Sequence, residues 1–287
     1  MKRLCFLIPF FFCILFTQNV QAGISSVRIY SGEGASQSSV KLIASMFQRH
    51  VKPAPQILYF EKLSSLIDNL KEDTEASLLV MPGGSTILYE HQFTSKISSE
   101  QREFLVQALR GKGPTQVSYL GIGAGAFFAA TDYKISFQME DREKSQLIHY
   151  ASPYNMKRLN LFPTMSSAFQ DFNPKNDEGA RFPIISLQTG EKGTVFWNGG
   201  PAFGSSYSYA YNVLASFDEN TFAIVGRKLG ENAFAVISGL QFEFDPYDSN
   251  NEFDIKDFPT HLHNGIRNGG IAKETAITVL KYLGFTI

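Results

Sequence analysis

The stretch Tyr119-Leu120-Gly121-Ile122-Gly123-Ala124-Gly125-Ala126-Phe127-Phe128-Ala129 decides how this chain is interpreted. A strand-like run passes directly into glycines at alternate positions, and small and aromatic residues follow. Small residues on both sides of Gly123 allow it to adopt the strained backbone of a nucleophile elbow, a sharp strand-to-helix turn that presents a catalytic side chain. We therefore expect a buried strand, a tight turn at Gly123 and a helix whose N-terminus helps to stabilise an anion.

Upstream of this turn, strand-like and helix-like segments alternate. The apolar patterns predict strands at 26–30, 56–60, 76–81 and 116–121, and helices at 38–50, 62–70 and 98–110. Ser98 and Gln101 have the spacing of a capping box at the start of the last helix. Repeated strand–helix units predict a flavodoxin-like α/β fold, a parallel sheet with helices on both faces. Ligands in such folds bind at the carboxyl ends of the strands, where Gly83-Gly84 and the Gly123 turn fall.

The second half of the chain is less regular and predicts insertions into this fold. Residues 160–177 read as an irregular insertion. Strands are expected at 194–197, at 213–217 and 221–225 as a hairpin, and at 233–238, with a closing helix at 272–282. We find no internal repeat or linker-like segment, which favours one domain over residues 23–287.

Four segments, in order, resemble the class I glutamine amidotransferase superfamily, and more narrowly the branch named for the N-terminal region of biotin–protein ligases. The resemblance covers most of the chain from Val27 to Glu243. The turn at Gly123 is similar to the Gly-x-Cys-x-Gly elbow of the superfamily. The other three segments are Val80-Met81-Pro82-Gly83-Gly84, Trp197-Asn198-Gly199-Gly200-Pro201-Ala202-Phe203 and Ile237-Ser238-Gly239-Leu240-Gln241-Phe242-Glu243. They resemble the oxyanion-hole segment, the Asn-Gly-Gly-Pro turn and the Ser-Gly-x-His-x-Glu segment.

The departures from the family pattern decide the functional interpretation. The resemblance implies a nucleophilic cysteine at position 123 and a histidine base at position 241, and this chain has Gly123 and Gln241. Glu243 alone matches, as the acidic partner. Glycine has no side chain that can attack, and a carboxamide cannot accept a proton near neutral pH. We therefore expect a catalytically inactive protein.

Without these catalytic side chains, the resemblance still implies a pocket, which we expect to bind a small polar ligand or a peptide end. Its expected residues are Gly83, Gly84, Ser85, Gly123, Ala124, Trp197, Asn198, Gly199, Gly200, Gln241 and Glu243. One alternative is a hydrolase or amidase that uses a relocated serine, with Ser85 as the candidate, or a bound metal. Another is a secreted partner-binding protein, which would use the phenols of Tyr207, Tyr209 and Tyr211 on one face of a strand. The same phenols could stack on a sugar-like ligand, although packing is the favoured interpretation.

The sequence gives no reason to expect a metal or a cofactor. His261 and His263 lie near Asp254 and Asp257, and the acidic segment 245–252 contains Asp245, Asp248 and Glu252. The first group has the composition of a solvated loop, and the second lacks the spacing of an EF-hand. No ATP, biotin or transfer-RNA motif is recognisable, and neither is a biotin ligase domain.

The N-terminus has the three parts of a secretory signal peptide. Lys2 and Arg3 precede an apolar run, and Val20-Gln21-Ala22 forms a small-x-small site, so we expect cleavage before Gly23. The apolar run is shorter than the ~20 residues of a spanning helix, which predicts a secreted or periplasmic protein without a membrane anchor. Cys5 and Cys13 are the two cysteines of the chain and lie in this segment, so the mature chain of 287 − 22 = 265 residues would contain no thiol.

The charge of this mature chain gives no argument for binding to nucleic acid. Loss of Lys2 and Arg3 leaves 26 − 2 = 24 basic residues against 27 acidic ones, a formal charge of −3.

Overall fold

Five parallel strands form the half of the sheet that carries the predicted site. They lie in the order β2-β1-β3-β4-β13. The structure is a computed structural model, and it describes residues 23–112, 116–131, 133–137, 148–150, 158–163, 165–168, 179–246, 262 and 270–287. The bounds of these strands are β1 Ser26–Tyr30, β2 Gln56–Phe60, β3 Ser77–Met81, β4 Val117–Ile122 and β13 Phe234–Ser238. Every neighbouring pair among them is parallel. The predicted parallel α/β sheet is therefore confirmed.

The sheet continues past β13 with short strands, several of them antiparallel. β12, Thr221–Lys228, pairs antiparallel with β13 and with β11, Asn212–Ser216. The predicted hairpin is thus confirmed. Beyond β12 lie β10 Pro201–Gly204, β7 Met165–Ser167, β5 Tyr133–Phe137 and β6 Ile148–Tyr150, while β8 Ile184–Leu187 and β9 Lys192–Thr194 extend from β11. The strand predicted at 194–197 is wrong, because β9 ends at Thr194 and Trp197 forms only an isolated bridge with Arg181.

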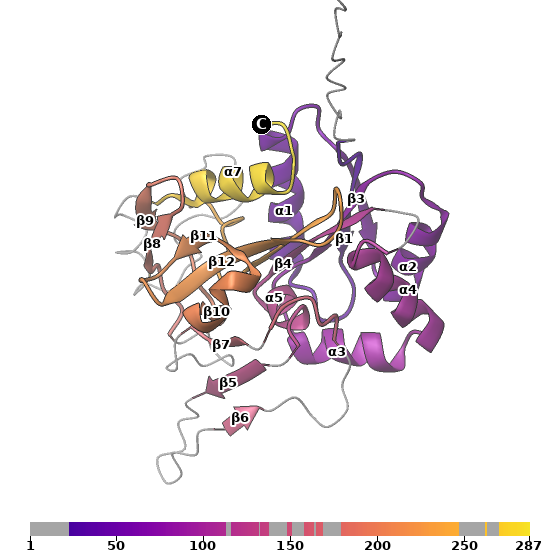
Figure 1. The fold of residues 1–287 in the computed structure, drawn as a ribbon, viewed down its shortest axis with the longest axis horizontal. Coiled ribbons are helices and arrows are strands. Elements are labelled where there is room, and N and C mark those ends of the chain that lie inside the picture. The colour runs from indigo at the N-terminus through magenta and orange to yellow at the C-terminus, as the bar shows by residue number, and fades with distance from the viewer. Residues whose placement is uncertain are drawn as a thin grey trace, which may run out of the picture.

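Helices cover both faces of the sheet, as predicted. α1 Gln37–His50 and α7 Ala272–Tyr282 lie on one face, and α2 Leu63–Glu72, α3 Thr86–Ser95, α4 Ser99–Leu109 and α5 Ala124–Phe128 lie on the other (Figure 1). A hydrophobic core lies on each face of the sheet, and alternate residues of β3 pack into one core or the other. Leu78 and Val80 pack in the cluster with α1 and α7, whereas Leu79 and Met81 pack in the cluster with α2 to α5.

Two local structures differ from the sequence-based expectation. α3 was not predicted, because its buried positions Thr86, Tyr89, Glu90 and Phe93 have helical spacing but include two polar side chains. Residues 205–210 form a 3-10 helix, η1, in place of the expected strand, so the Tyr207, Tyr209 and Tyr211 face does not exist as predicted. Glycine and serine turns around 204–208 favour a tight helical turn over an extended strand.

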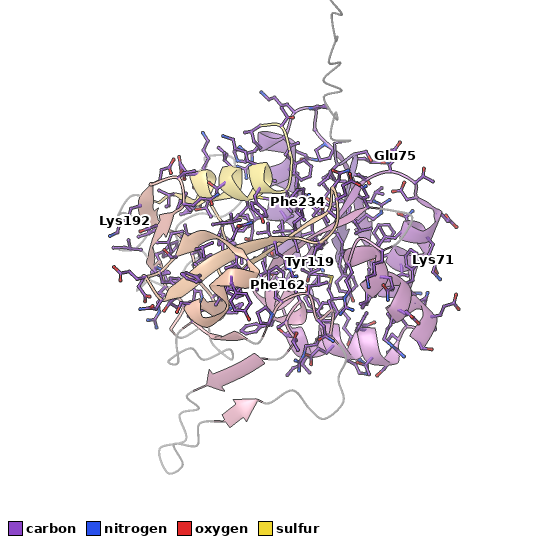
Figure 2. The ribbon with its side chains drawn as sticks, viewed as in Figure 1. Lys71, Glu75, Tyr119, Phe162, Lys192 and Phe234 are labelled. Atoms are coloured by element: carbon purple, nitrogen blue, oxygen red, sulfur yellow. The ribbon has the colours of Figure 1, made fainter. Side chains whose placement is uncertain are left out.

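The predicted capping box is present at α4, where the Ser98 side chain accepts from Gln101 N–H and the Gln101 side chain accepts from Ser98 N–H. Figure 2 shows Tyr119 and Phe162 near the middle of the molecule, with Lys71 and Lys192 at its periphery.

Among the described residues, no helix combines the length and the apolar character that a membrane span requires. The predicted signal peptide, residues 1–22, lies outside the described residues.

Candidate functional site

The elbow predicted at Gly123 is present. β4 ends at Ile122, Gly123 follows with φ 53° and ψ −107°, and α5 begins at Ala124. This backbone conformation is costly for a residue with a side chain. The Gly123 N–H donates to the carbonyl of Ser238 at 2.8 Å, which ties the turn to the end of β13. The chain therefore keeps the geometry that presents a nucleophile but has hydrogen in place of the side chain.

The glycines on either side of Gly123 are required by close approaches of backbone. A Cβ on Gly125 would lie 2.0 Å from the carbonyl oxygen of Met81, and a Cβ on Gly121 would lie 2.6 Å from the carbonyl oxygen of Gly125. At Gly123 itself, a Cβ would meet only Gln241 Nε2, at 3.1 Å, and the Cα of Gly83, at 3.7 Å. Gly83, Gly123 and Gln241, expected at one site, are thus brought together.

The side chain of Gln241 is held against the backbone of Asn198. Its Oε1 accepts from Asn198 N–H at 2.9 Å, and its Nε2 donates to the Asn198 carbonyl at 3.3 Å. Gln241 is buried, and its own N–H donates to the Phe196 carbonyl. Both ends of the carboxamide are therefore bound to backbone, close to the Gly123 turn.

Glu243 lies behind this pair and is linked to Ser39, near the start of α1. The Ser39 hydroxyl donates to Glu243 Oε1 at 2.7 Å and accepts from Gly83 N–H at 3.2 Å. Glu243 is 2% exposed, and its Oε2 has no hydrogen-bond partner among the described residues. Burial raises the pKa of the Glu243 carboxyl to about 7, and the hydrogen bond from Ser39 works in the opposite direction.

Ser39 is the site residue that the sequence interpretation missed. A signal for it exists, because Ser39, Ile43 and Phe47 are spaced by four residues and all three lie on the buried stripe of α1. A hydroxyl on an apolar stripe needs a partner inside the protein. Its partner, Glu243, is 204 residues away, a contact that only the fold reveals.

The expected oxyanion-hole amides are only partly available. Gly83 is buried and its N–H donates to the Ser39 hydroxyl, so this amide is already used within the protein. Gly84 is exposed, with φ 147°, and a Cβ there would lie 1.9 Å from the Gly34 carbonyl oxygen. Ser85 is the N-cap residue of α3 without a side-chain capping bond, and its N–H donates to the Gly34 carbonyl at 2.8 Å.

The Asn198–Gly200 turn packs directly on the segment after β13. A Cβ on Gly200 would lie 2.0 Å from the Gly239 carbonyl oxygen, and a Cβ on Gly239 would lie 1.8 Å from the Pro201 carbonyl oxygen. Gly199 has a positive φ of 73°. Trp197 is 0% exposed and donates from Nε1 to the Gly200 carbonyl at 3.0 Å, so its ring lies in the core rather than at the mouth of a pocket.

Several other candidate residues are held by backbone or lie outside the described residues. The Ser238 hydroxyl bonds to the backbone of Leu240. Asp248, Glu252, Asp254, Asp257, His261, His263 and the side chain of Tyr207 are not among the described positions. In the part of the chain that the structure describes, no group of three or more His, Cys, Asp or Glu side chains could hold a metal ion.

Comparison with known proteins places the chain beside one family. Residues 25–275 match the family model described as "Biotin-protein ligase, N terminal", and no curated protein matches. A solved glutamine amidotransferase is 14% identical, with a TM-score of 0.48, over 75% of this chain and 88% of that one. A putative ThuA-like protein from Bacteroides uniformis ATCC 8492 is 10% identical, with a TM-score of 0.40, over 78% and 85% of the two chains.

Proposed function

Because the chain belongs to the family of the biotin-protein ligase N-terminal region, matched over residues 25–275, we propose that it is an exported, catalytically inactive member that binds a small polar ligand or a peptide end. The observation that carries this proposal is the relation of Gly123 to Gln241. The elbow residue has no side chain, and Gln241 Nε2 would lie 3.1 Å from any Cβ placed there. The position of a nucleophile therefore faces a carboxamide that is already bound to Asn198.

Two chemical roles are lost together in this arrangement. A cysteine nucleophile and a histidine base act as a unit, so the absence of both removes the attacking group and its activation. Glu243 remains, but its described partner is Ser39 rather than an imidazole. Without a histidine to orient, the Glu243 carboxyl has no role in a cysteine–histidine mechanism.

The proposed ligand carries a hydrogen-bond donor. Glu243 Oε2 is buried without a partner among the described residues, and a ligand that donates to it would remove the cost of that unmade bond. The exposed backbone at Gly84 borders the same cluster. A thermal-shift survey of amides, amino acids and sugars, comparing the natural chain with Glu243→Gln, identifies ligands whose stabilisation requires the carboxylate.

Hydrolysis assays test the proposed inactivity. The chain from Gly23 onward, incubated with glutamine and with an activated ester, is expected to show no turnover above buffer. The matched variants are Gly123→Cys, Gln241→His and the double variant, in which the two groups are restored singly and together. Turnover by the natural chain that disappears in Glu243→Gln would contradict the proposal.

Export is tested separately. Sequencing of the N-terminus of the protein recovered from the periplasm or the medium is expected to begin at Gly23. A protein that retains residues 1–22 and stays in the cytoplasm would contradict this part of the proposal.

A hydrolase with a relocated serine is the second candidate, and the structure favours Ser39 over Ser85 in that role. Ser39 donates to a carboxyl whose pKa is near 7, an arrangement that can accept a proton. The Ser39 hydroxyl is buried, however, and also accepts from Gly83. Treatment with a fluorophosphonate followed by peptide mapping separates the two functions, because only a nucleophilic Ser39 becomes labelled.

A further inference from the structure

A cavity lies between α3, α4 and the segments that follow α5, and none of its lining residues belongs to the Gly123 site. Its volume is about 610 Å³, within the range of small-molecule pockets. Arg102, Glu103 and Val106 line it from one face of α4, and Phe93 lines it from α3. Arg158 forms part of the opposite wall. We call this space the Arg102 cavity.

Arg102 brings unused donors to the cavity wall. Its Nη1 donates to the carbonyls of Phe93, Thr94 and Ile97, at 3.3, 2.9 and 2.8 Å. These bonds fix the guanidinium at the C-terminal end of α3. A guanidinium has five N–H donors, and among the described residues Nε and Nη2 of Arg102 have no hydrogen-bond partner. Two parallel donors in a fixed plane match the two oxygens of a carboxylate.

The charges around the cavity leave Arg102 as the dominant cation. Arg158 is buried and forms an ion pair with Glu90, which is 0% exposed, and its Nη1 donates to the Thr131 carbonyl at 2.9 Å. Glu90 therefore offsets the charge of Arg158. Glu103 is exposed at the rim, where solvent and salt screen its charge. A half-buried guanidinium therefore outweighs an exposed carboxylate within the cavity.

The remaining wall is mixed, because Ser99, Thr131 and Asn160 contribute polar groups while Phe93 and Val106 contribute apolar surface. Phe93 is buried in the core cluster and Val106 packs against the same cluster. An inorganic ion would fill little of a space of about 610 Å³ and would leave this apolar surface wet. We propose that the Arg102 cavity binds a small organic carboxylate with an apolar or aromatic body, with the carboxylate on Arg102 and the body against Phe93 and Val106.

Binding of benzoate tests this proposal on the full exported chain. Titration calorimetry is expected to give a Kd on the order of 0.1–1 mM, the range for a ligand of this size. Benzamide, which has the same shape without the charge, is expected to bind at least about 10-fold more weakly. Absence of saturable benzoate binding up to about 10 mM overturns the proposal.

Substitutions around the cavity test where the carboxylate of benzoate binds. Arg102→Lys keeps the charge and loses the planar pair of donors, so benzoate affinity is expected to fall about 10-fold. Arg110→Lys, at the exposed end of α4, is the matched control and leaves the affinity unchanged. Glu103→Gln is expected to strengthen binding about 2-fold by removal of the rim charge.

A second variant keeps the test decisive if Arg102→Lys disturbs α3. Val106→Trp fills the cavity without removing a contact of Arg102, and is expected to abolish benzoate binding while the circular dichroism spectrum is retained. Equal affinity for benzamide, or phosphate binding that equals benzoate binding and responds to the same variants, overturns the assignment to an organic carboxylate. Unchanged affinity in both Arg102→Lys and Val106→Trp overturns the location.

Discussion

Gln241 makes two hydrogen bonds to the backbone of a single residue, Asn198, one as an acceptor at 2.9 Å and one as a donor at 3.3 Å. The carboxamide thus takes the place of a peptide group beside the Asn-Gly-Gly-Pro turn. The Gln241 side chain therefore acts as a structural support, and its removal leaves backbone groups to be solvated in a largely buried position.

Gln241→Ala is therefore expected to lower the free energy of unfolding by about 1–3 kcal/mol, the usual cost of buried polar groups that lose their partners. Gln188→Ala, at an exposed position, is the control and should change stability by less than about 0.5 kcal/mol. Urea denaturation measures both. Equal effects of the two substitutions would show that the Gln241–Asn198 pair contributes nothing.

Glycine substitutions around the elbow are expected to differ in severity. Gly125→Ala would place a Cβ 2.0 Å from a backbone oxygen. A Cβ on Gly123 would meet the end of the Gln241 side chain at 3.1 Å and the Cα of Gly83 at an ordinary contact distance, on a backbone with positive φ. We expect losses of at least about 3 kcal/mol for Gly125→Ala and about 1–2 kcal/mol for Gly123→Ala. Gly204→Ala, where a Cβ would meet nothing within 4 Å, is the matched control. A milder effect at Gly125 than at Gly123 contradicts the described packing.

Glu243→Gln is expected to change how stability depends on pH. The folded-state pKa of about 7 lies above the ordinary value of 4.5, so the contribution of the protonated carboxyl is complete below about pH 4.5 and is lost as pH rises through 7. Relative to the natural chain, the variant should therefore gain about 1–3 kcal/mol between about pH 5 and pH 8. Glu231→Gln, at an exposed position, should show no such trend. A parallel pH profile for both variants would refute the assignment.

Ser39→Ala removes the link between the Gly83 loop and Glu243. We expect a loss of about 1–3 kcal/mol, because a buried N–H and a buried carboxyl each lose a partner. The pKa of Glu243 should also rise further, since the hydrogen bond from Ser39 lowers it. Carbon NMR of the labelled carboxyl follows this pKa, and Ser38→Ala is the matched control one residue away.

The parallel half of the fold could be predicted because its strands are short apolar runs buried on both faces, as in Leu78–Met81. α3 could not, since Thr86 and Glu90 occupy buried positions and interrupt the apolar stripe that reveals a helix. The proximity of Gly83, Gly123 and Gln241 could be predicted from glycine-rich motifs that follow predicted strands. The Ser39–Glu243 bond and the Gln241–Asn198 pairing could not, because each depends on side chains brought together by the fold rather than by spacing.

The packing at Gly123 has a consequence for how this sequence can change over generations. A cysteine at position 123 alone would press on Gln241, and a histidine at position 241 alone would give up the paired bonds to Asn198. Each single step toward a cysteine–histidine pair therefore lowers stability before any activity can be selected. The two positions therefore constrain each other's substitutions.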